Sequence, residues 1–493
     1  MLNKNLSAFK SFLLIFTLLS IQNQFAQASD TIWTNIFGGA DDEFGHFAEQ
    51  TNDGGYILTG YTKSFGAGLN DIWLIKTNSN GDTLWTKTFG GSQDDNSSCV
   101  HQTSDGGYII FGETVSFGPT YWKAWLIKTD QFGDTSWTSL IGENRHYFIQ
   151  SGMELLGGNL IFVGYTKASG AGQEDIWIVK TNESGDTIWT ETFGGPGNDL
   201  SSTIQQTNDG GYIIAASTNS FGAGSYDAWL IRTDADGDTI WTRTYGGTDT
   251  DHASDVKQTD DNGFIIAGST RSFGHVNNYN DAWIIKTNSN GDTLWTKTFG
   301  GDLHDGALSV QQTSDGGFLI VGSLGIDLSN RDIWLIKTNE SGDSLWTKTF
   351  GGANWDIGRS TEPTSDGGYI ICGDFYQSGT SNYDIWLLKT DPVPNDVQPL
   401  EQGNIPDNYT LKQNYPNPFN PATTIEFGIP ESEQVKLSIY NLLGEPVEVL
   451  VDKYLTAGNY KVEWNANEQR SGVYFYQIQA GEFTLTNKMI LVK

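Results

Sequence analysis

The fold is decided by residues 71–91, which read DIWLIKTNSNGDTLWTKTFGG. An apolar run, an Asn/Ser/Gly/Asp turn and a second run rich in Thr, Trp and Phe predict a strand, a tight turn and a strand. A fixed repeat of such strands is typical of a β-propeller. Both tryptophans of this hairpin recur seven times at spacings of 51 to 54 residues, at Trp73, Trp125, Trp177, Trp229, Trp283, Trp334 and Trp386, and at Trp33, Trp85, Trp137, Trp189, Trp241, Trp295 and Trp346.

The rest of the repeat predicts two further strands. Residues 46–62, HFAEQTNDGGYILTGYT, place an Asn-Asp-Gly-Gly turn between a polar-alternating strand and an apolar one. Each unit therefore has four strands, which we name A to D from the axis outward. A strand D comes first, at 30–37, whereas the last strands A to C, at 357–390, have no D after them. We expect seven blades, with the N-terminal strand closing the last one.

The apolar runs and the glycines have structural explanations. The central strands are apolar throughout, as at 283–285, because neighbouring blades cover both faces of each sheet. The recurring tryptophans are therefore predicted to pack blades together. The turn glycines supply the positive φ that tight hairpins need. Cys99 and Cys372 fall in blades 2 and 7, too far apart to bridge, so two buried free thiols are expected.

The first 28 residues have the pattern of a secretory signal peptide. Lys4 and Lys10 precede an apolar run at 12–19, and Ala26-Gln27-Ala28 provides a small-residue cleavage site. We predict cleavage before Ser29. No later stretch is apolar enough to cross a membrane.

The charge is strongly negative and unevenly placed. The chain has a formal charge of −31, and residues 392–493 hold 7 Lys/Arg against 12 Asp/Glu. Without Lys4 and Lys10, residues 30–391 thus hold 19 against 47, a net charge of −28. Such a surface repels nucleic acid and anionic lipid. It suits cations, neutral glycans or basic partners, and a solvated acidic coat explains it equally well.

Variation between repeats is concentrated in the D–A and B–C loops, which leave the same face because strand direction alternates. Loops on a rigid scaffold carry function, so this face is the predicted binding face. Aromatics beside carboxylates suit stacking on a sugar and bonding its hydroxyls, although tyrosines that shield blade seams explain the same pattern. Blade 3 also departs from the repeat. The candidate ligand-binding residues are Tyr121, Trp122, Tyr226, Tyr279 and Tyr383 in the B–C loops, and Arg145, His146 and Tyr147 in blade 3.

Catalysis and metal binding have less support than ligand binding. No metal-binding His or Cys motif, nucleophile elbow or P-loop is present. A pair of glycosidase carboxylates stays possible, because such a pair is defined by its separation in space and not by its spacing in the sequence. No cofactor is expected. One turn, with Asp234, Asp236 and Asp238, opens like a calcium loop, but no Glu follows at the spacing that completes one.

After Thr390 the composition changes. Residues 392–414 are a Pro-rich polar linker, and residues 415–493 alternate as six or seven short strands, which predicts a small Ig-like β-sandwich. Several motifs here resemble the type A C-terminal sorting domain of proteins exported by the type IX secretion system. The residues that carry the resemblance are Tyr415, Pro416, Asn417, Pro418, Phe419, Gly444, Gly472, Gly481 and Lys488.

The resemblance implies export through the periplasm and an outer-membrane translocon, then removal of this domain and release or attachment at the surface of a Bacteroidota-type bacterium. The repeats resemble kelch propellers in architecture alone. We therefore expect a signal peptide (1–28), a seven-bladed propeller (29–391), a linker and a sorting domain. Binding of an extracellular glycan or protein by a monomer is the first functional hypothesis. The alternatives are a polysaccharide-active glycosidase or lyase and a structural surface component.

Overall fold

The computed structural model describes residues 31–390 and 406–493, together with the backbone of 398–399. It leaves out 119–120, 144, 168–169, 171, 276–278, 353, 378, 380–381, 445, 456, 467–468 and 482. The predicted signal peptide and most of the predicted linker before residue 406 lie outside the described residues. Within the described ranges, no helix is long and apolar enough to span a membrane.

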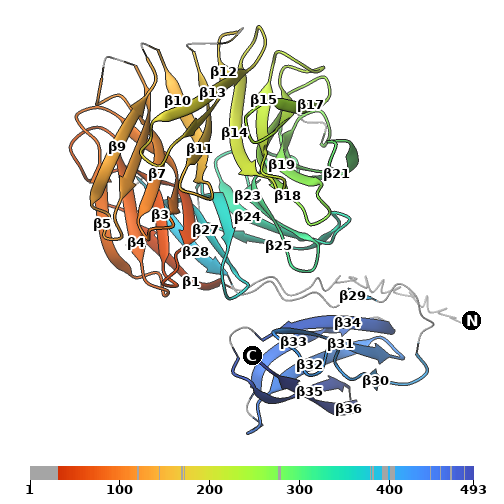
Figure 1. Ribbon diagram of the computed structural model, residues 1–493. Helices are drawn as coiled ribbons and strands as arrows, with labels where there is room; N and C mark the ends of the chain where they lie inside the picture. Colours follow the sequence, from red (N-terminus) through yellow and green to blue (C-terminus); the bar gives the residue numbers. More distant parts are fainter. Residues whose placement is uncertain are drawn as a thin grey trace, which may run out of the picture.

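Seven four-stranded antiparallel sheets are arranged in a ring, so the predicted seven-bladed propeller is confirmed (Figure 1). In blades 1 to 6 each sheet follows chain order. The first strands of neighbouring blades contact one another and the last strands are the most exposed, so the first strand is innermost and the last is outermost. The strands of blades 1 to 3 are β2 (Glu43–Gln50), β3 (Tyr56–Thr62), β4 (Asp71–Thr77) and β5 (Thr83–Phe89); β6 (Asp95–Gln102), β7 (Tyr108–Thr114), β8 (Lys123–Thr129) and β9 (Thr135–Ile141); and β10 (Tyr147–Glu154), β11 (Leu160–Thr166), β12 (Asp175–Thr181) and β13 (Thr187–Phe193).

Blades 4 to 6 repeat the same order. Their strands are β14 (Asp199–Gln206), β15 (Tyr212–Thr218), β16 (Asp227–Thr233) and β17 (Thr239–Tyr245); β18 (Asp251–Gln258), β19 (Phe264–Thr270), β20 (Asp281–Thr287) and β21 (Thr293–Phe299); and β22 (Gly306–Gln312), β23 (Phe318–Gly325), β24 (Arg331–Thr338) and β25 (Ser344–Phe350).

Blade 7 is assembled from both ends of the repeat region. It contains β26 (Ile357–Pro363), β27 (Tyr369–Gln377) and β28 (Asn382–Thr390), with β1 (Thr31–Phe37) as its outermost strand. Strand β1 pairs antiparallel with β28, from Thr31 opposite Thr390 to Phe37 opposite Ile385. The predicted closure of the ring by the N-terminal strand is therefore confirmed.

The propeller core lies between blades. Seven clusters of buried apolar residues each join two adjacent blades, and the predicted packing role of the first tryptophan of each repeat is confirmed: Trp177 of blade 3, for example, packs with Phe111 of blade 2. The second tryptophan covers a glycine of the next C–D turn. A β-carbon on Gly81, whose φ is 80°, would lie 2.6 Å from the Trp33 ring. The repeated glycine is thus needed both for the turn and for this contact.

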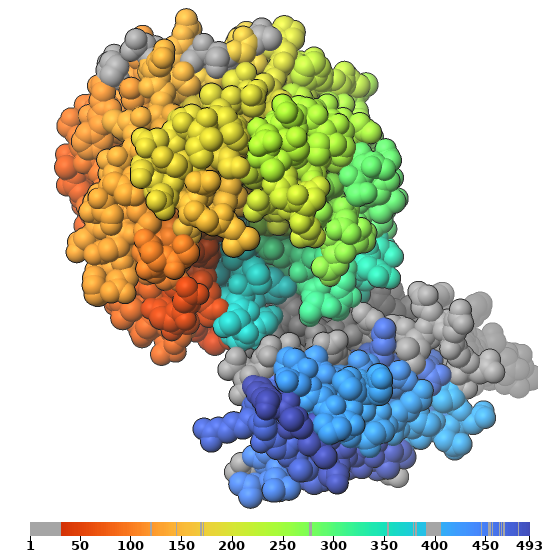
Figure 2. All heavy atoms as spheres, in the orientation of Figure 1, coloured from red at the N-terminus to blue at the C-terminus, as the bar shows by residue number. Residues whose placement is uncertain are grey.

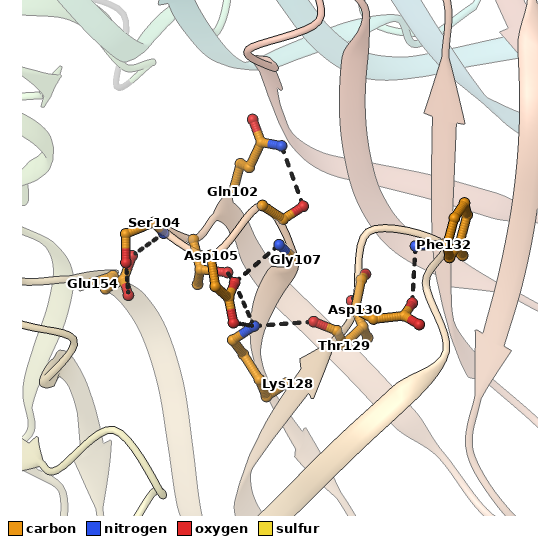
Figure 3. A network of polar contacts seen from close by, with 11 residues as sticks. Gln102, Ser104, Asp105, Gly107, Lys128, Thr129, Asp130, Phe132 and Glu154 are labelled. Carbon is orange, nitrogen blue, oxygen red and sulfur yellow. Dashed lines mark hydrogen bonds and ion pairs between the residues drawn. The ribbon is translucent and has the colours of Figure 1, made fainter.

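One face of the ring, which we call the turn face, is made of the A–B and C–D turns. In blade 2, Lys128 donates to Asp105 at 2.8 Å and to the Thr129 carbonyl at 3.0 Å, while the Asp105 carboxylate accepts the Gly107 N–H (Figure 3). Glu154 of blade 3 accepts the Ser104 N–H of the same turn. Five of the other six blades have the equivalent ion pair, and blade 3 does not: Lys76–Asp53, Arg232–Asp209, Lys286–Asp261, Lys337–Asp315 and Lys389–Asp366.

The C-terminal region is a sandwich of two four-stranded sheets, in agreement with the predicted fold. A single buried core that includes Phe427, Trp464 and Tyr476 lies between the sheets. The first sheet contains β29 (Gln398–Pro399), β34 (Gly458–Asn465), β31 (Ala422–Ile429) and β30 (Thr410–Leu411). The second contains β33 (Pro446–Leu455), β32 (Glu433–Tyr440), β35 (Gly472–Ala480) and β36 (Phe483–Leu491).

Both cysteines are buried and free, as predicted. Cys99 lies in β6 and packs in the core between blades 2 and 3, whereas Cys372 lies in β27 and packs in the core between blades 7 and 1. Blade 1 therefore separates the two thiols.

Candidate functional site on the loop face

The second face of the propeller, which we call the loop face, is made of the D–A and B–C loops. A repeated backbone hydrogen bond joins neighbouring blades there: the first residue of strand A donates its N–H to the carbonyl of the residue just before the C-strand Asp of the preceding blade. Asp95 bonds Asn70 and Asp251 bonds Tyr226, both at 2.8 Å. At six seams this bond places the side chains of a B–C loop beside the start of the next strand A.

Buried acids lie in pairs beneath these seams. Asp71 accepts the N–H groups of Ala67 and Gly68, both at 2.9 Å, and Asp95 accepts the Gly91 N–H and the Ser116 hydroxyl. A β-carbon on Gly90 would lie 1.9 Å from Asp71 Oδ1 and 2.8 Å from Asp95 Oδ2, so only glycine fits between them. The equivalent pairs are Asp175 with Asp199, Asp227 with Asp251, Asp281 with Asp305, Asp332 with Asp356, and Asp384 with Glu43.

Crowding of carboxylates in this buried layer opposes their ionisation. Burial, together with the nearby charges of Glu43 and Asp42, raises the pKa of Asp384 to about 6. Burial and the neighbouring Asp95 also raise the pKa of Asp71, although backbone hydrogen bonds act against the shift. Asp384 and Asp71 therefore release their protons at a higher pH than ordinary aspartates do.

The seam between blades 2 and 3 has no such pair. Lys123 replaces the first acid and donates to the Gly142 carbonyl at 3.0 Å. Tyr147 replaces the second: its side chain is buried and packs on Trp177 with ring centres 4.8 Å apart. Tyr147 was predicted to border a pocket, but its side chain belongs to the core because it fills the space that a carboxylate occupies elsewhere. Arg145 is exposed and bonds the Lys167 carbonyl at 3.4 Å.

The predicted loop aromatics lie over the seams. Tyr121 contacts His146 edge to face at 5.3 Å between ring centres, and Trp122 lies 5.9 Å from Phe148. The N–H of Trp122 also approaches His146 Nδ1 at 3.4 Å. Further round the ring, Tyr226 packs against His252, Tyr279 against His304 and Tyr383 against Phe44. These contacts match the seam-shielding explanation, and the rings stay partly exposed, so ligand binding by them remains a prediction.

Sequence reasoning missed the residues where strand A and strand B reach the mouth of the central channel. Phe44 stacks on Tyr383 and lies 5.0 Å from Tyr61, and Arg359 forms an ion pair with Asp374 at 2.6 Å. Alternation along strand A could have identified Phe44 and Arg359, because these two residues are less buried than their neighbours in the strand. Figure 2 shows the propeller surface hollowed where its orange, lime and teal parts meet.

Glu113 is a second residue that sequence reasoning missed. It occupies in β7 the position that Asp374 occupies in β27. Among the residues that the structure describes, no cation pairs with Glu113 and its Oε2 has no hydrogen-bond partner. Burial raises the pKa of Glu113 to about 8, although hydrogen bonds from Ile149 and Asn96 oppose the shift. This carboxyl is therefore mostly protonated at neutral pH.

Charged side chains gather deeper in the channel, towards the turn face. Glu49 of blade 1 pairs with His101 of blade 2 at 2.8 Å, and Lys257 of blade 5 reaches Glu362 of blade 7 at 3.5 Å. Burial acts against the charge of His101, but the Glu49 carboxylate outweighs it and raises the pKa of the imidazole. These contacts link blade 1 to blade 2 and blade 5 to blade 7 about the axis.

The residues of the suggested calcium turn form an Asx turn in the structure. Asp234 Oδ1 accepts the N–H groups of Asp236 and Asp238, at 2.9 and 3.0 Å, as an Asx turn does. Across the described ranges and outside their gaps, no group of three or more His, Cys, Asp or Glu side chains is placed to hold a metal ion.

A pocket of about 310 Å³ lies between blades 5 and 6 on the loop face, lined by His275, Asp281, Thr298, Phe299, Gly300 and Trp334. Asp281 is buried and accepts the His275 N–H at 2.7 Å, while the His275 ring is more than half exposed. A polar pair in an apolar wall is the usual composition of a ligand pocket.

Known proteins resemble the chain in two ways. Residues 413–493 match the family model of the secretion system C-terminal sorting domain, which includes the predicted motif residues from Tyr415 to Lys488. No curated protein sequence matches the chain.

Solved structures resemble the chain more distantly. PorZ, described as a surface component of the type IX secretion system of Porphyromonas gingivalis, is 11% identical with a TM-score of 0.43, over 91% of this chain and 59% of PorZ. The β-propeller domain of the trilobed protease from Pyrococcus furiosus is 10% identical with a TM-score of 0.42, over 72% of this chain and 98% of that domain. Puromycin hydrolase is 10% identical with a TM-score of 0.43, over 79% of this chain and 59% of the hydrolase.

The chain thus spans about three fifths of the length of PorZ and of puromycin hydrolase. The sorting domain implies the type IX secretion machinery as a partner. The protein is therefore a seven-bladed β-propeller followed by a secretion system C-terminal sorting domain, which directs it to the cell surface or into the medium.

Proposed function

We propose that the exported propeller binds an extracellular glycan at its loop face, around the mouth of the central channel. One observation carries this proposal: partly exposed aromatic rings recur beside polar groups at successive seams, as with Tyr121 at His146 and Tyr383 at Phe44. Aromatic faces stack on the apolar faces of sugars, and neighbouring amides, imidazoles and carboxyls bond their hydroxyls. The turn face supports the assignment by contrast, because its ion pairs are nearly the same in every blade.

Two exposed aromatics in one blade provide a matched test. Tyr121 lies on the loop face of blade 2 and is 39% exposed, whereas Phe132 lies on its turn face and is 61% exposed. We expect Tyr121→Ala in the whole chain to weaken polysaccharide binding about fivefold, since one aromatic contact contributes about 1 kcal/mol. Phe132→Ala should leave binding unchanged. Equal effects, or no saturable binding to any of a panel of neutral and acidic polysaccharides, would refute the proposal.

The same panel tests the suggested calcium turn. Binding is measured in calcium and in chelator for the wild-type chain and for Asp236→Asn. A calcium requirement lost in the variant would support a role for Asp234, Asp236 and Asp238, whereas equal binding in both buffers would assign these residues to the turn alone.

A polysaccharide-active enzyme is the second candidate, and Glu113 is the observation that favours it. A carboxyl with a pKa of about 8 beside the channel mouth suits a general acid, and Asp374 provides an ion-paired carboxylate at the same position of blade 7. New reducing ends in the binding assay, lost in Glu113→Gln, would support catalysis. Saturable binding without new reducing ends would make the propeller a recognition module.

A further inference from the structure

A cationic cluster stands on the loop face of blades 5 to 7, in a chain whose formal charge is −31. It consists of Arg271, His304 and Arg331, with Trp355 beside them. Arg271 directly follows β19, His304 shortly precedes β22, Arg331 begins β24 and Trp355 shortly precedes β26. All four therefore lie where one blade meets the next. Arg271 and Trp355 are exposed, and the other two are half-buried.

Arg271 and His304 are held by the same residue. Arg271 Nε donates to Asn280 Oδ1 at 2.5 Å, and the Asn280 N–H donates to His304 Nδ1 at 3.2 Å. Because Nδ1 accepts this bond, a neutral His304 carries its proton on Nε2 and can donate it. The Tyr279 ring meets the imidazole edge to face, with ring centres 4.7 Å apart.

Arg331 joins the cluster through Gly325. Gly325 pairs with Arg331 across β23 and β24, and a β-carbon on Gly325 would lie 2.9 Å from the His304 carbonyl oxygen. The Arg331 guanidinium lies over the Trp355 ring, 4.6 Å from its centre. Burial lowers the pKa of His304, and the positive charges of Arg331 and Arg271 lower it further. The imidazole therefore lies within the electrostatic influence of both arginines.

Neither arginine of the cluster has an acid partner among the residues that the structure describes. Elsewhere in the propeller, Arg232 pairs with Asp209, Arg243 approaches Asp292 at 4.0 Å and Arg359 pairs with Asp374. Asp305 lies near Arg331 but is buried, and its carboxylate accepts the N–H groups of Gly301 and Gly325, both at 2.7 Å.

Like charges that lack counter-charges repel each other, and an anion that binds between them removes the repulsion. The acidic remainder of the surface does not cancel this local field, because charges separated by more than about 8 Å are screened at physiological salt. Guanidinium groups also match carboxylate and sulfate in planar, two-point contacts.

We propose that the cationic cluster binds the carboxylate or sulfate group of an acidic glycan, with the Trp355 ring beside the sugar. The proposal rests on glycan binding at the loop face and adds the ligand class. Arg271 and Arg331 neutralise the anionic group, and His304 Nε2 provides an additional donor. A glycan bound here follows the rim of the loop face from blade 5 to blade 7.

The test measures binding of the whole chain to polygalacturonate, dextran sulfate and uncharged dextran. The variants are Arg271→Gln and Arg331→Gln, and the control is Arg243→Gln, which removes the same charge from an exposed residue of the outermost strand β17. We expect each cluster variant to weaken binding of at least one acidic polymer about tenfold, because the variant loses a charge-assisted hydrogen bond to the anionic group. Arg243→Gln should bind like wild type, and equal melting temperatures establish that the variants fold.

The polymers separate the two sources of negative charge and the two proposals. If the cluster variants bind only polygalacturonate more weakly than wild type, the ligand group is a carboxylate. If they bind only dextran sulfate more weakly, it is a sulfate. Wild-type binding should also fall more steeply with salt than binding by Arg331→Gln. Equal affinity of cluster variants and control overturns the cationic site. Binding of dextran alone overturns it as well but leaves glycan recognition standing, whereas binding of no polysaccharide in this or the wider panel overturns both.

Discussion

The two faces of the propeller use aspartate in opposite ways. On the turn face, burial disfavours the charge of Asp105, but hydrogen bonds from Lys128, Thr103 and Gly107 outweigh it and lower its pKa to about 2. On the loop face, burial and neighbouring carboxylates raise the pKa of Asp384 to about 6. The ionised form of aspartate is thus stabilised on the turn face and disfavoured on the loop face. What decides is whether the repeat places a cation or a second acid beside it.

The uniform turn face thus belongs to the scaffold, whereas the variable loop face is the candidate binding site. Six blades repeat the turn-face ion pair, with only Arg232 substituting for lysine, so this face carries little that distinguishes one blade from another. The loop face keeps its buried acids at six seams but changes the side chains above them at every seam. A binding surface requires such variation, whereas a closed ring requires the uniform face.

The largest expected effect comes from breaking a turn-face pair. Lys337 and Asp315 are 1% and 10% exposed in their side chains and lie 2.8 Å apart. Asp315→Asn would leave a buried ammonium without its carboxylate, and we expect it to lower the free energy of unfolding by about 3–5 kcal/mol in urea titrations.

Asp343→Asn is the matched control for this variant. Asp343 belongs to the same blade and pairs with Lys297 at 2.7 Å, but its side chain is 61% exposed. Its replacement should leave the unfolding curve unchanged. If both variants destabilise the protein equally, burial of the turn-face pair is not what stabilises the blade.

A smaller effect with a distinctive pH dependence is expected from Asp384→Asn. Because the folded pKa of Asp384 is raised, the acid stabilises the protein fully below its unfolded pKa near 3.8 and loses this contribution as pH rises through about 6. Asparagine mimics the protonated acid. The variant should therefore be more stable than wild type at pH 8, by about 1–3 kcal/mol, and equal to it near pH 4.

Asp261→Asn on the turn face should behave in the opposite way. Burial opposes its charge, but Lys286, Thr259 and Gly263 lower the pKa of Asp261 to about 2. Its contribution is present above the unfolded pKa near 3.8 and is lost as pH falls through about 2. This variant should be less stable than wild type at pH 7 and should approach it towards pH 2. The same pH trend in both variants would contradict the comparison of the faces.

The smallest effect is expected at blade 3, where the turn-face pair is absent. Lys180 has no carboxylate from its own A–B turn and instead contacts the Ala235 carbonyl at 3.3 Å and the ring of Trp189 at 5.9 Å. Lys180→Met keeps the packing of the chain and should change the free energy of unfolding by less than about 1 kcal/mol. A loss as large as that of Asp315→Asn would show that the lysine itself, rather than the pair, is required.

The fold was readable from the sequence because its signals are local and repeated. The tryptophan spacing, the Asp-Gly-Gly turns and the unmatched first strand together predict seven blades and their closure. The site was less readable, because seams join residues from different repeats. Glu113 and Asp374 differ from the tyrosines and serines at the same strand position, but only the packed blades show that one has a cation and the other none. The burial of Tyr147 could not be read from the sequence, because it depends on the space that a carboxylate fills at the other seams.

Closure of the ring by β1 has a consequence for the order of events during synthesis and export. Thr31, in the first strand of the propeller, finds its partner Thr390 only when the last blade has been made. The sorting domain, matched at residues 413–493, follows that blade along the chain. A chain that stops before β28 therefore lacks both the strand that seals the ring and the domain that directs export.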